Sequence, residues 1–183
     1  MIPSRCLHEY FCQAPLVTVS EDFTARLWNV VDGKELAVLR GHQDAVVTAV
    51  FSSNGTKVVT ASDDNTARLW DASTGDVLAV LHGHKHWLYG AIFSPDGTKI
   101  VTVSDDLTAR LWDANTGEEL AVFRGHASPV VSAAFSRDGR KVVTTSWDRT
   151  SRIWNVPPSQ QELIDLARQS VQRSLTPEER RRF

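Results

Sequence analysis

One interval organises this sequence: the tryptophans Trp28, Trp70, Trp112 and Trp154 follow one another at a spacing of 42 residues. A repeat in which several residue types stay in phase indicates one small structural unit that is stacked on its own copies. The further residues that keep this interval are Gly41-His42, Gly83-His84 and Gly125-His126; Ser20, Ser62, Ser104 and Ser146; Asp22, Asp64, Asp106 and Asp148; and Arg26, Arg68, Arg110 and Arg152.

Within one period, residues 41–82, short apolar segments alternate with turn signals. Valines favour buried strands, and Asn54-Gly55 is a strong hairpin signal. Four short antiparallel strands form a sheet that cannot bury both of its faces alone, so the sheet must stack on its neighbours. The sequence therefore predicts an all-β fold, a partial β-propeller built from about three to four four-stranded antiparallel blades.

The phase of the repeat divides the chain into an irregular N-terminus, a set of blades and a tail. After Pro157-Pro158, a capping box of Ser159 and Glu162 and a helical spacing of apolar residues predict a short C-terminal α-helical tail. The expected boundaries are 1–14 for the N-terminus, 15–40, 41–82, 83–124 and 125–156 for the blades, and 157–183 for the tail.

The motif set resembles the WD-repeat (WD-40, Trp-Asp repeat) β-propeller family over residues 15–156. Trp70-Asp71 and Trp112-Asp113 have the signature dipeptide, whereas Trp28 and Trp154 are followed by asparagine. The resemblance implies a structural tetrad in each blade, in which Asp accepts from His, His meets Ser, and Ser meets the indole N–H. The expected tetrads are His42, Ser62, Asp64 and Trp70; His84, Ser104, Asp106 and Trp112; and His126, Ser146, Asp148 and Trp154.

The same residues admit a second interpretation, since His126, Ser146 and Asp148 are the residue types of an acyl-transfer triad. A catalytic site has no reason to recur in three repeats, so we expect a structural role and no enzyme activity. His82, His84 and His86 alternate as metal ligands might be spaced, but they have no carboxylate or cysteine partner, and no metal site is predicted. No glycine-rich phosphate loop is present, and no cofactor is expected.

Differences between the repeats locate the expected partner surface. The repeats vary in the loop after Gly-His and in the turn between the second and third strands, and both should emerge at one end of the blade. Tryptophan and arginine dominate interaction hot spots, which favours Trp87, Trp147 and Arg149 as anchors. The residues expected around these anchors are Lys85, His86 and Leu107.

Composition excludes several classes of protein. Twenty Lys and Arg against 22 Asp and Glu give a formal charge of −2, so no nucleic-acid partner is expected. No segment approaches the roughly 18 apolar residues that would cross a membrane. Cys6 and Cys12 are the only cysteines, which fits neither a disulfide framework nor a zinc site and favours a cytoplasmic location.

Three to four blades are fewer than most closed rings contain, because propellers typically have about 4 to 8. We therefore expect one of two arrangements. The chain is a C-terminal fragment of a longer protein, or it is a half-ring that self-association completes. The tail segment Leu-Thr-Pro-Glu-Glu-Arg, residues 175–180, also resembles the C-terminal extension of multidomain WD-repeat signalling proteins. This resemblance implies an alternative function, the C-terminal sensor portion of a larger protein with an NTPase- or protease-like module upstream. The leading functional expectation is a non-catalytic scaffold that binds protein partners of unknown identity.

Overall fold

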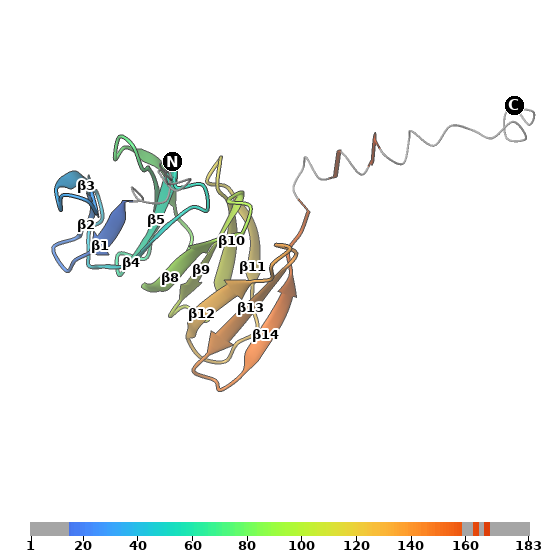
Figure 1. Ribbon diagram of the computed structural model, residues 1–183. Coiled ribbons are helices and arrows are strands. Elements are labelled where there is room, and N and C mark those ends of the chain that lie inside the picture. The colour runs from blue at the N-terminus through green and yellow to red at the C-terminus, as the bar shows by residue number, and fades with distance from the viewer. Residues whose placement is uncertain (1–14, 159–162, 165–166, 169–183) are drawn as a thin grey trace, which may run out of the picture.

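The computed structural model of the chain describes residues 15–158, 163–164 and 167–168. Four antiparallel sheets follow one another in chain order, from blue to orange in Figure 1. Their strands are β1 (Leu16–Val19), β2 (Thr24–Trp28) and β3 (Glu35–Arg40) in the first blade; β4 (Val46–Phe51), β5 (Lys57–Ser62), β6 (Ala67–Asp71) and β7 (Val77–Leu81) in the second; β8 (Leu88–Phe93), β9 (Lys99–Ser104), β10 (Ala109–Asp113) and β11 (Glu119–Phe123) in the third; and β12 (Val130–Phe135), β13 (Lys141–Ser146) and β14 (Ser151–Asn155) in the fourth.

The predicted partial propeller is confirmed. The second and third blades have four strands each, and each of their strands pairs with the next one along the chain. The first and fourth blades have three strands each within the described residues. The hairpin between the first two strands of a blade closes on glycine with positive φ, 71° at both Gly55 and Gly97, a conformation that other residues adopt only at a cost.

The core lies between the blades, in three separate apolar clusters. Leu27 of the first blade packs with Trp70 of the second, Leu69 of the second with Trp112 of the third, and Leu111 of the third with residues of the fourth. Each middle blade therefore contributes one face to each of two cores, as expected for a sheet that cannot bury both faces by itself.

Burial along the second strand of each blade shows where this stacking stops. All six residues of β9 are buried, whereas those of β13 alternate between buried and more exposed. Val142 packs against the third blade, so Val143 points to the opposite side of the sheet. Ile153, on β14, is 70% exposed, although its repeat equivalents Leu69 and Leu111 are fully buried. One face of the fourth blade is thus open in the described part of the chain.

The predicted helical tail stays a prediction. Beyond Pro158 the structure describes residues 163–164 and 167–168, which are helical, and the capping box at Ser159 and Glu162 lies outside the described residues. The predicted irregular N-terminus, residues 1–14, also lies outside them.

Candidate functional site

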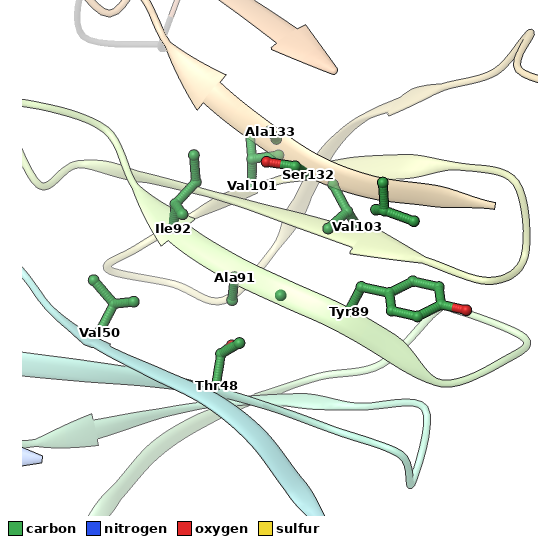
Figure 2. A pocket seen from close by; sticks show the side chains of 11 residues that line it. Thr48, Val50, Tyr89, Ala91, Ile92, Val101, Val103, Ser132 and Ala133 are labelled. Atoms are coloured by element: carbon green, nitrogen blue, oxygen red, sulfur yellow. The ribbon is translucent and has the colours of Figure 1, made fainter. Parts of the chain in front are cut away.

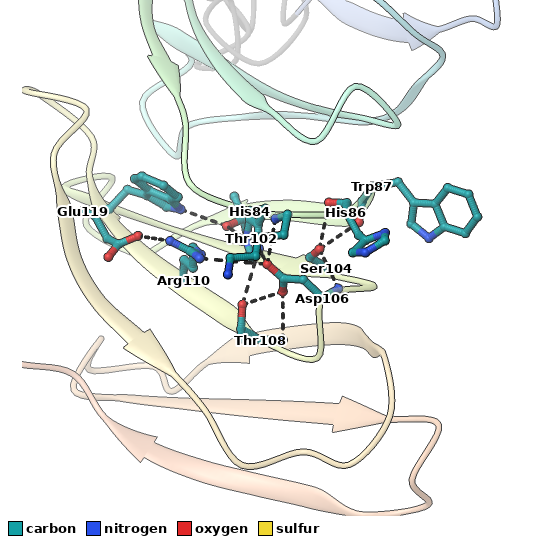
Figure 3. A network of polar contacts seen from close by, with 11 residues as sticks. His84, His86, Trp87, Thr102, Ser104, Asp106, Thr108, Arg110 and Glu119 are labelled. Atoms are coloured by element: carbon teal, nitrogen blue, oxygen red, sulfur yellow. Dashed lines mark hydrogen bonds and ion pairs between the residues drawn. The ribbon is translucent and has the colours of Figure 1, made fainter.

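In the third blade, four side chains form a continuous series of hydrogen bonds, part of which is drawn in Figure 3. His84 precedes β8, Asp106 follows β9, and Thr102 and Trp112 lie on β9 and β10. His84 Nδ1 is 2.8 Å from Asp106 Oδ2, and His84 Nε2 is 2.8 Å from Thr102 Oγ1. The Trp112 indole N–H donates to the same hydroxyl oxygen at 2.8 Å. Carboxylate, imidazole, hydroxyl and indole are thereby joined inside one blade.

The other blades repeat this arrangement in whole or in part. In the part of the first blade that the structure describes, only the last link is present: the Trp28 indole donates to Thr18 Oγ1 at 2.8 Å, at an exposed position. The complete sets of the second and fourth blades are His42, Asp64, Thr60 and Trp70, and His126, Asp148, Thr144 and Trp154.

The expected serine members of the tetrads, Ser62, Ser104 and Ser146, are wrong. Ser104 Oγ donates to the backbone carbonyls of His86 and Trp87 and accepts the Asp106 N–H at 3.0 Å, so it fastens the loop and does not join His84 to the indole. Ser62 and Ser146 make the equivalent bonds to the carbonyls of residues 44 and 128.

The reason for this difference is depth along the strand. Thr102 and Ser104 project from the same face of β9, but two residues span about 7 Å of strand. Register places Arg110 opposite Thr102 and Trp112 opposite Ile100, so Thr102 lies diagonal to the indole while Ser104 is one step further toward the loop. A signal for the threonine was present, since Thr18, Thr60, Thr102 and Thr144 also recur at the repeat interval.

The protons of this network can be assigned from what each group can do. A carboxylate only accepts, so His84 Nδ1 donates to Asp106, and the Thr102 hydroxyl, which accepts the indole N–H, has its own hydrogen for Nε2. Burial acts to raise the pKa of Asp106, but hydrogen bonds from His84 and Thr108 outweigh it and hold this pKa well below its usual range. The carboxylate is therefore charged at neutral pH.

The geometry does not bring the candidate triad together. Ser146 Oγ donates to the carbonyl of Ser128 at 2.9 Å, while His126 Nε2 contacts Thr144 Oγ1 at 2.9 Å. Thr144 is fully buried. A hydroxyl in that position cannot reach a substrate, so the hydrogen-bonded set can hold the blade together but has no accessible nucleophile.

Two of the recurring arginines, Arg26 and Arg110, form ion pairs beside these residues. Arg26 pairs with Asp22 at 3.0 Å and with Glu35 at 2.8 Å. Arg110 is buried, donates to Glu119 and lies 4.0 Å from Asp106. Arg26 and Arg110 therefore pair with acidic residues of their own blades.

Backbone contacts hold the two variable loops together at one end of each blade. The N–H of Asp63 donates to the carbonyl of Ala45 at 3.0 Å, and that of Asp105 donates to the carbonyl of Trp87 at 3.1 Å. In the fourth blade the Trp147 N–H makes the same contact, at 3.1 Å, with the carbonyl of Pro129. We call this end, formed by the loops and turns that contain residues 42–45, 63–65, 84–87, 105–107, 126–129 and 147–149, the loop end.

The predicted partner residues all lie at the loop end and are exposed. Trp147 and Trp87 are exposed by 61% and 48%, and the Trp87 ring projects away from the blade in Figure 3. Leu107 is 39% exposed. The remaining predicted residues are also exposed; they are Lys85, His86 and Arg149.

Tyr89 and Asp105, which the sequence did not single out, complete this surface. The ring of Tyr89 meets that of Trp147 edge to face, with centroids 5.4 Å apart, and thereby joins the third blade to the fourth. The Tyr89 hydroxyl donates to Asp105 Oδ1 at 3.1 Å. The signal that was available is that Tyr89 stands where the neighbouring repeats have Val47 and Val131.

One turn of each blade, between β1 and β2 in the first blade and between the second and third strands in the others, has one residue with positive φ, and in the last three blades this residue belongs to the loop end. Leu107 and Arg149 both have φ of 67°, as do Asn65 and Phe23 within a few degrees. Asparagine tolerates this left-handed conformation, whereas other side chains adopt it only at a cost in conformational free energy. The third and fourth blades therefore carry residues that this turn does not favour.

A shallow apolar hollow lies where the innermost strands β4, β8 and β12 meet (Figure 2). Val50, Ala91, Ile92 and Ala133 are among the residues that line it. Tyr89 stands at one end of the hollow, and its ring leads away from it toward the loop end.

Neither a metal centre nor a membrane helix is found in the described residues. No group of three or more His, Cys, Asp or Glu side chains there could hold a metal ion, and His84 of the alternating histidines is bound to Asp106 and Thr102. No helix of the described residues is long and apolar enough to cross a membrane. Cys6 and Cys12 lie outside the described residues.

The comparisons with known proteins agree with this geometry. The family model described as "WD domain, G-beta repeat" matches residues 33–71, 75–113 and 117–155, which together make up more than half of the chain. No curated protein matches the chain. The first two matched segments end at the Trp-Asp pair, and the third ends at Trp154-Asn155, where asparagine replaces the aspartate. In all three, the tryptophan of this pair donates to the buried threonine. The chain belongs to the WD-repeat family.

Proposed function

We propose that this chain is a non-catalytic scaffold that binds protein partners through its loop end. The family favours this role, because WD-repeat domains generally act as interaction scaffolds. Trp87, Trp147 and Arg149 are the proposed anchors, with Lys85 and His86 beside them. Leu107 adds an exposed apolar side chain to the same surface.

One observation carries the proposal: the contact that recurs at the position of Trp147 is made by the backbone, and the Trp147 ring stays largely exposed although its edge meets Tyr89. Asp63 and Asp105 occupy the same position in the preceding blades and make the same N–H contact to a carbonyl. Nothing in that contact calls for an aromatic side chain, yet Trp147 is large and 61% exposed. A large aromatic side chain that stays mostly exposed at a position where the recurring contact needs only the backbone is the expected mark of an interface anchor.

The strained turn supports the same proposal. Leu107 and Arg149 occupy a left-handed position that Asn65 fills at lower cost in the second blade. Unfavourable backbone conformations persist mainly where the residue has another use. At the loop end that use is contact with a partner.

Affinity capture with three baits tests the proposal. The baits are the unmodified chain, a loop-end variant with Trp87→Ala and Trp147→Ala, and an opposite-end control with Arg137→Ala and Arg140→Ala. We expect the same partners on the unmodified chain and on the control, and their loss from the loop-end variant. Partners that stay bound to the loop-end variant, or that are lost equally from both variants, would contradict the proposal.

A second candidate is the sensor portion of a larger multidomain signalling protein. The observation that favours it is the open face of the fourth blade, where Val143 and Ile153 have no covering blade among the described residues. A further blade or a second copy of the chain would bury this face. The cytoplasmic location expected from the sequence stays a prediction, which imaging of a tagged chain would check.

A further inference from the structure

The inner side of the loop end differs in charge from its outer side. Within each turn, residue 63, 105 or 147 contacts the segment that leads into the innermost strand, whereas residue 65, 107 or 149 leads to the third strand and lies on the outer side. Arg149 is thus on the outer side. Lys85 belongs there as well, because its N–H contacts Asp106 and the chain reaches the inner side only at Trp87.

The inner side carries carboxylates and aromatic rings. The inner turn position holds Glu21, Asp63, Asp105 and Trp147 in the four successive blades. Tyr89 lies among the last three of these, since it contacts the ring of Trp147 and donates to Asp105, and the charge of Asp63 also acts on its hydroxyl.

These carboxylates form no ion pair with a cationic side chain among the described residues. None of the ion pairs within the described part of the chain includes Asp63 or Asp105. Burial raises the pKa of Asp63, and repulsion from Asp44 and Asp64 raises it further. The negative charge of this surface is therefore left for an external cation to neutralise.

We propose that the inner side of the loop end binds an arginine side chain of a protein partner, with Trp147 and Tyr89 as the aromatic surface and Asp63 and Asp105 as the carboxylates. A guanidinium is planar, so it can stack on an aromatic ring while its N–H groups donate to a carboxylate. An ammonium group satisfies the charge but not the planar contact. This proposal rests on the proposed function, and it names the chemistry that the partner would present.

The probe for this site is a capped peptide, acetyl-Gly-Gly-Arg-Gly-Gly-amide. Binding to the full chain would be followed by nuclear magnetic resonance, through the indole N–H signals of the six tryptophans. The matched peptides replace arginine by citrulline, which has nearly the same shape without the charge, by lysine, or by glutamate. We expect arginine to bind most tightly, lysine more weakly, and citrulline and glutamate not detectably.

Variants of the chain locate the site. A cation over an aromatic ring contributes about 0.5–2 kcal/mol, so Trp147→Ala should weaken binding of the arginine peptide by about 2- to 30-fold. Trp147→Tyr should restore most of it. Asp105→Asn should weaken binding as well, because it removes the charge but keeps an oxygen that can accept from Tyr89. Glu21→Gln is the matched control, since it makes the same change of charge at the same turn position of the first blade, away from the aromatic pair.

Several results would overturn the inference. They are equal binding of the citrulline peptide, preference for the glutamate peptide, a Trp147→Ala variant that binds as the unmodified chain does, or equal weakening by Glu21→Gln and Asp105→Asn. The outcome is separate from that of the proposed function. If partners depend on Trp87 and Trp147 but the arginine peptide does not bind, the scaffold proposal stands and the arginine site falls.

Discussion

Replacing Thr102 by valine removes one hydroxyl from the centre of the third blade and keeps the shape of the side chain. The hydroxyl has two buried partners, since it accepts from the Trp112 indole at 2.8 Å and contacts His84 Nε2 at 2.8 Å. Thr102 is fully buried, and Trp112 and His84 are buried around it. Water cannot replace the lost hydroxyl there, so the variant leaves one donor and one acceptor without a partner.

The expected cost follows from these two groups. A buried polar group without a partner costs about 1–3 kcal/mol, so Thr102→Val should lower the free energy of unfolding by about 2–6 kcal/mol. That is a large share of the roughly 5–15 kcal/mol that stabilises an ordinary domain. Ser104→Ala should cost less, about 1–2 kcal/mol, because the carbonyl of Trp87 keeps its bond from the Asp105 N–H. The other groups that lose a partner, the His86 carbonyl and the Asp106 N–H, lie at the loop end, where burial is only partial.

The assay is equilibrium unfolding in urea, followed by far-ultraviolet circular dichroism, with the slope of the transition compared between variants. Thr18→Val is the matched control: it removes the same hydroxyl from the same tryptophan contact, but at an exposed position with no histidine. This control should stay within about 0.5 kcal/mol of the unmodified chain. The reasoning is refuted if Thr102→Val unfolds at the same urea concentration as the unmodified chain, or if Ser104→Ala costs more than Thr102→Val.

Three further predictions concern pH, a turn and an open face. Because the pKa of Asp106 in the folded chain lies below its unfolded value of about 3.9, the charged carboxylate contributes its full stabilisation above that pH and loses it as pH falls further. Asp106→Asn should therefore lower the free energy of unfolding by about 1.5–3 kcal/mol near neutral pH. The difference in stability between the variant and the unmodified chain should narrow in urea titrations at acid pH, and a difference that widens would contradict the argument. Leu107→Asn should raise the free energy of unfolding by about 0.5–1 kcal/mol, because asparagine tolerates the left-handed φ of 67° better than leucine does. The reverse change, Asn65→Leu, is the control and should lower the free energy of unfolding in the same urea assay. Variants as stable as the unmodified chain would contradict the inferred backbone strain. The exposed face around Ile153 should make the chain self-associate, so light scattering after size exclusion should show a mass that rises with protein concentration. Ile153→Glu should abolish this rise. A 20.3 kDa monomer at all concentrations of the unmodified chain would exclude self-association through this face.

Most of the fold could be predicted because the same strand and turn signals occur in each repeat. A strand or turn signal that is weak in one blade returns in phase in the next, as Asn54-Gly55 does in Asp96-Gly97. The stacking of blades follows from the same fact, since a small sheet with two apolar faces needs a neighbour on each side. The open face at Ile153 follows as well, because a residue in the phase of Leu69 and Leu111 is expected to be buried.

The hydrogen-bonded sets were only partly predictable. Histidine, aspartate and tryptophan recur in phase, and the resemblance to the family implies their roles. Phase cannot choose between Thr102 and Ser104, because both hydroxyls recur at the same interval and face the same side of the strand. Their separation along β9 decides which one reaches the indole, and that depends on strand register. The contact between Tyr89 and Trp147 was out of reach for a similar reason: it joins two blades, and the spacing between blades is not written in either repeat alone.

The side chains of the loop end can differ in chemistry because the recurring contact there uses backbone atoms that every residue except proline has. At the inner turn position the structural hydrogen bond runs from a backbone N–H to a backbone carbonyl. Asp63 and Trp147 therefore make the same bond although their side chains differ. Deeper in the blade the opposite holds, since the bonds of Thr102 require a hydroxyl and those of Asp106 a carboxylate. A residue type that recurs thus marks a side chain that the fold uses, and a residue type that differs marks one that the fold leaves free. Where such a position carries an exposed indole beside carboxylates that form no ion pair within the described residues, the simplest physical use for it is recognition of a cationic partner.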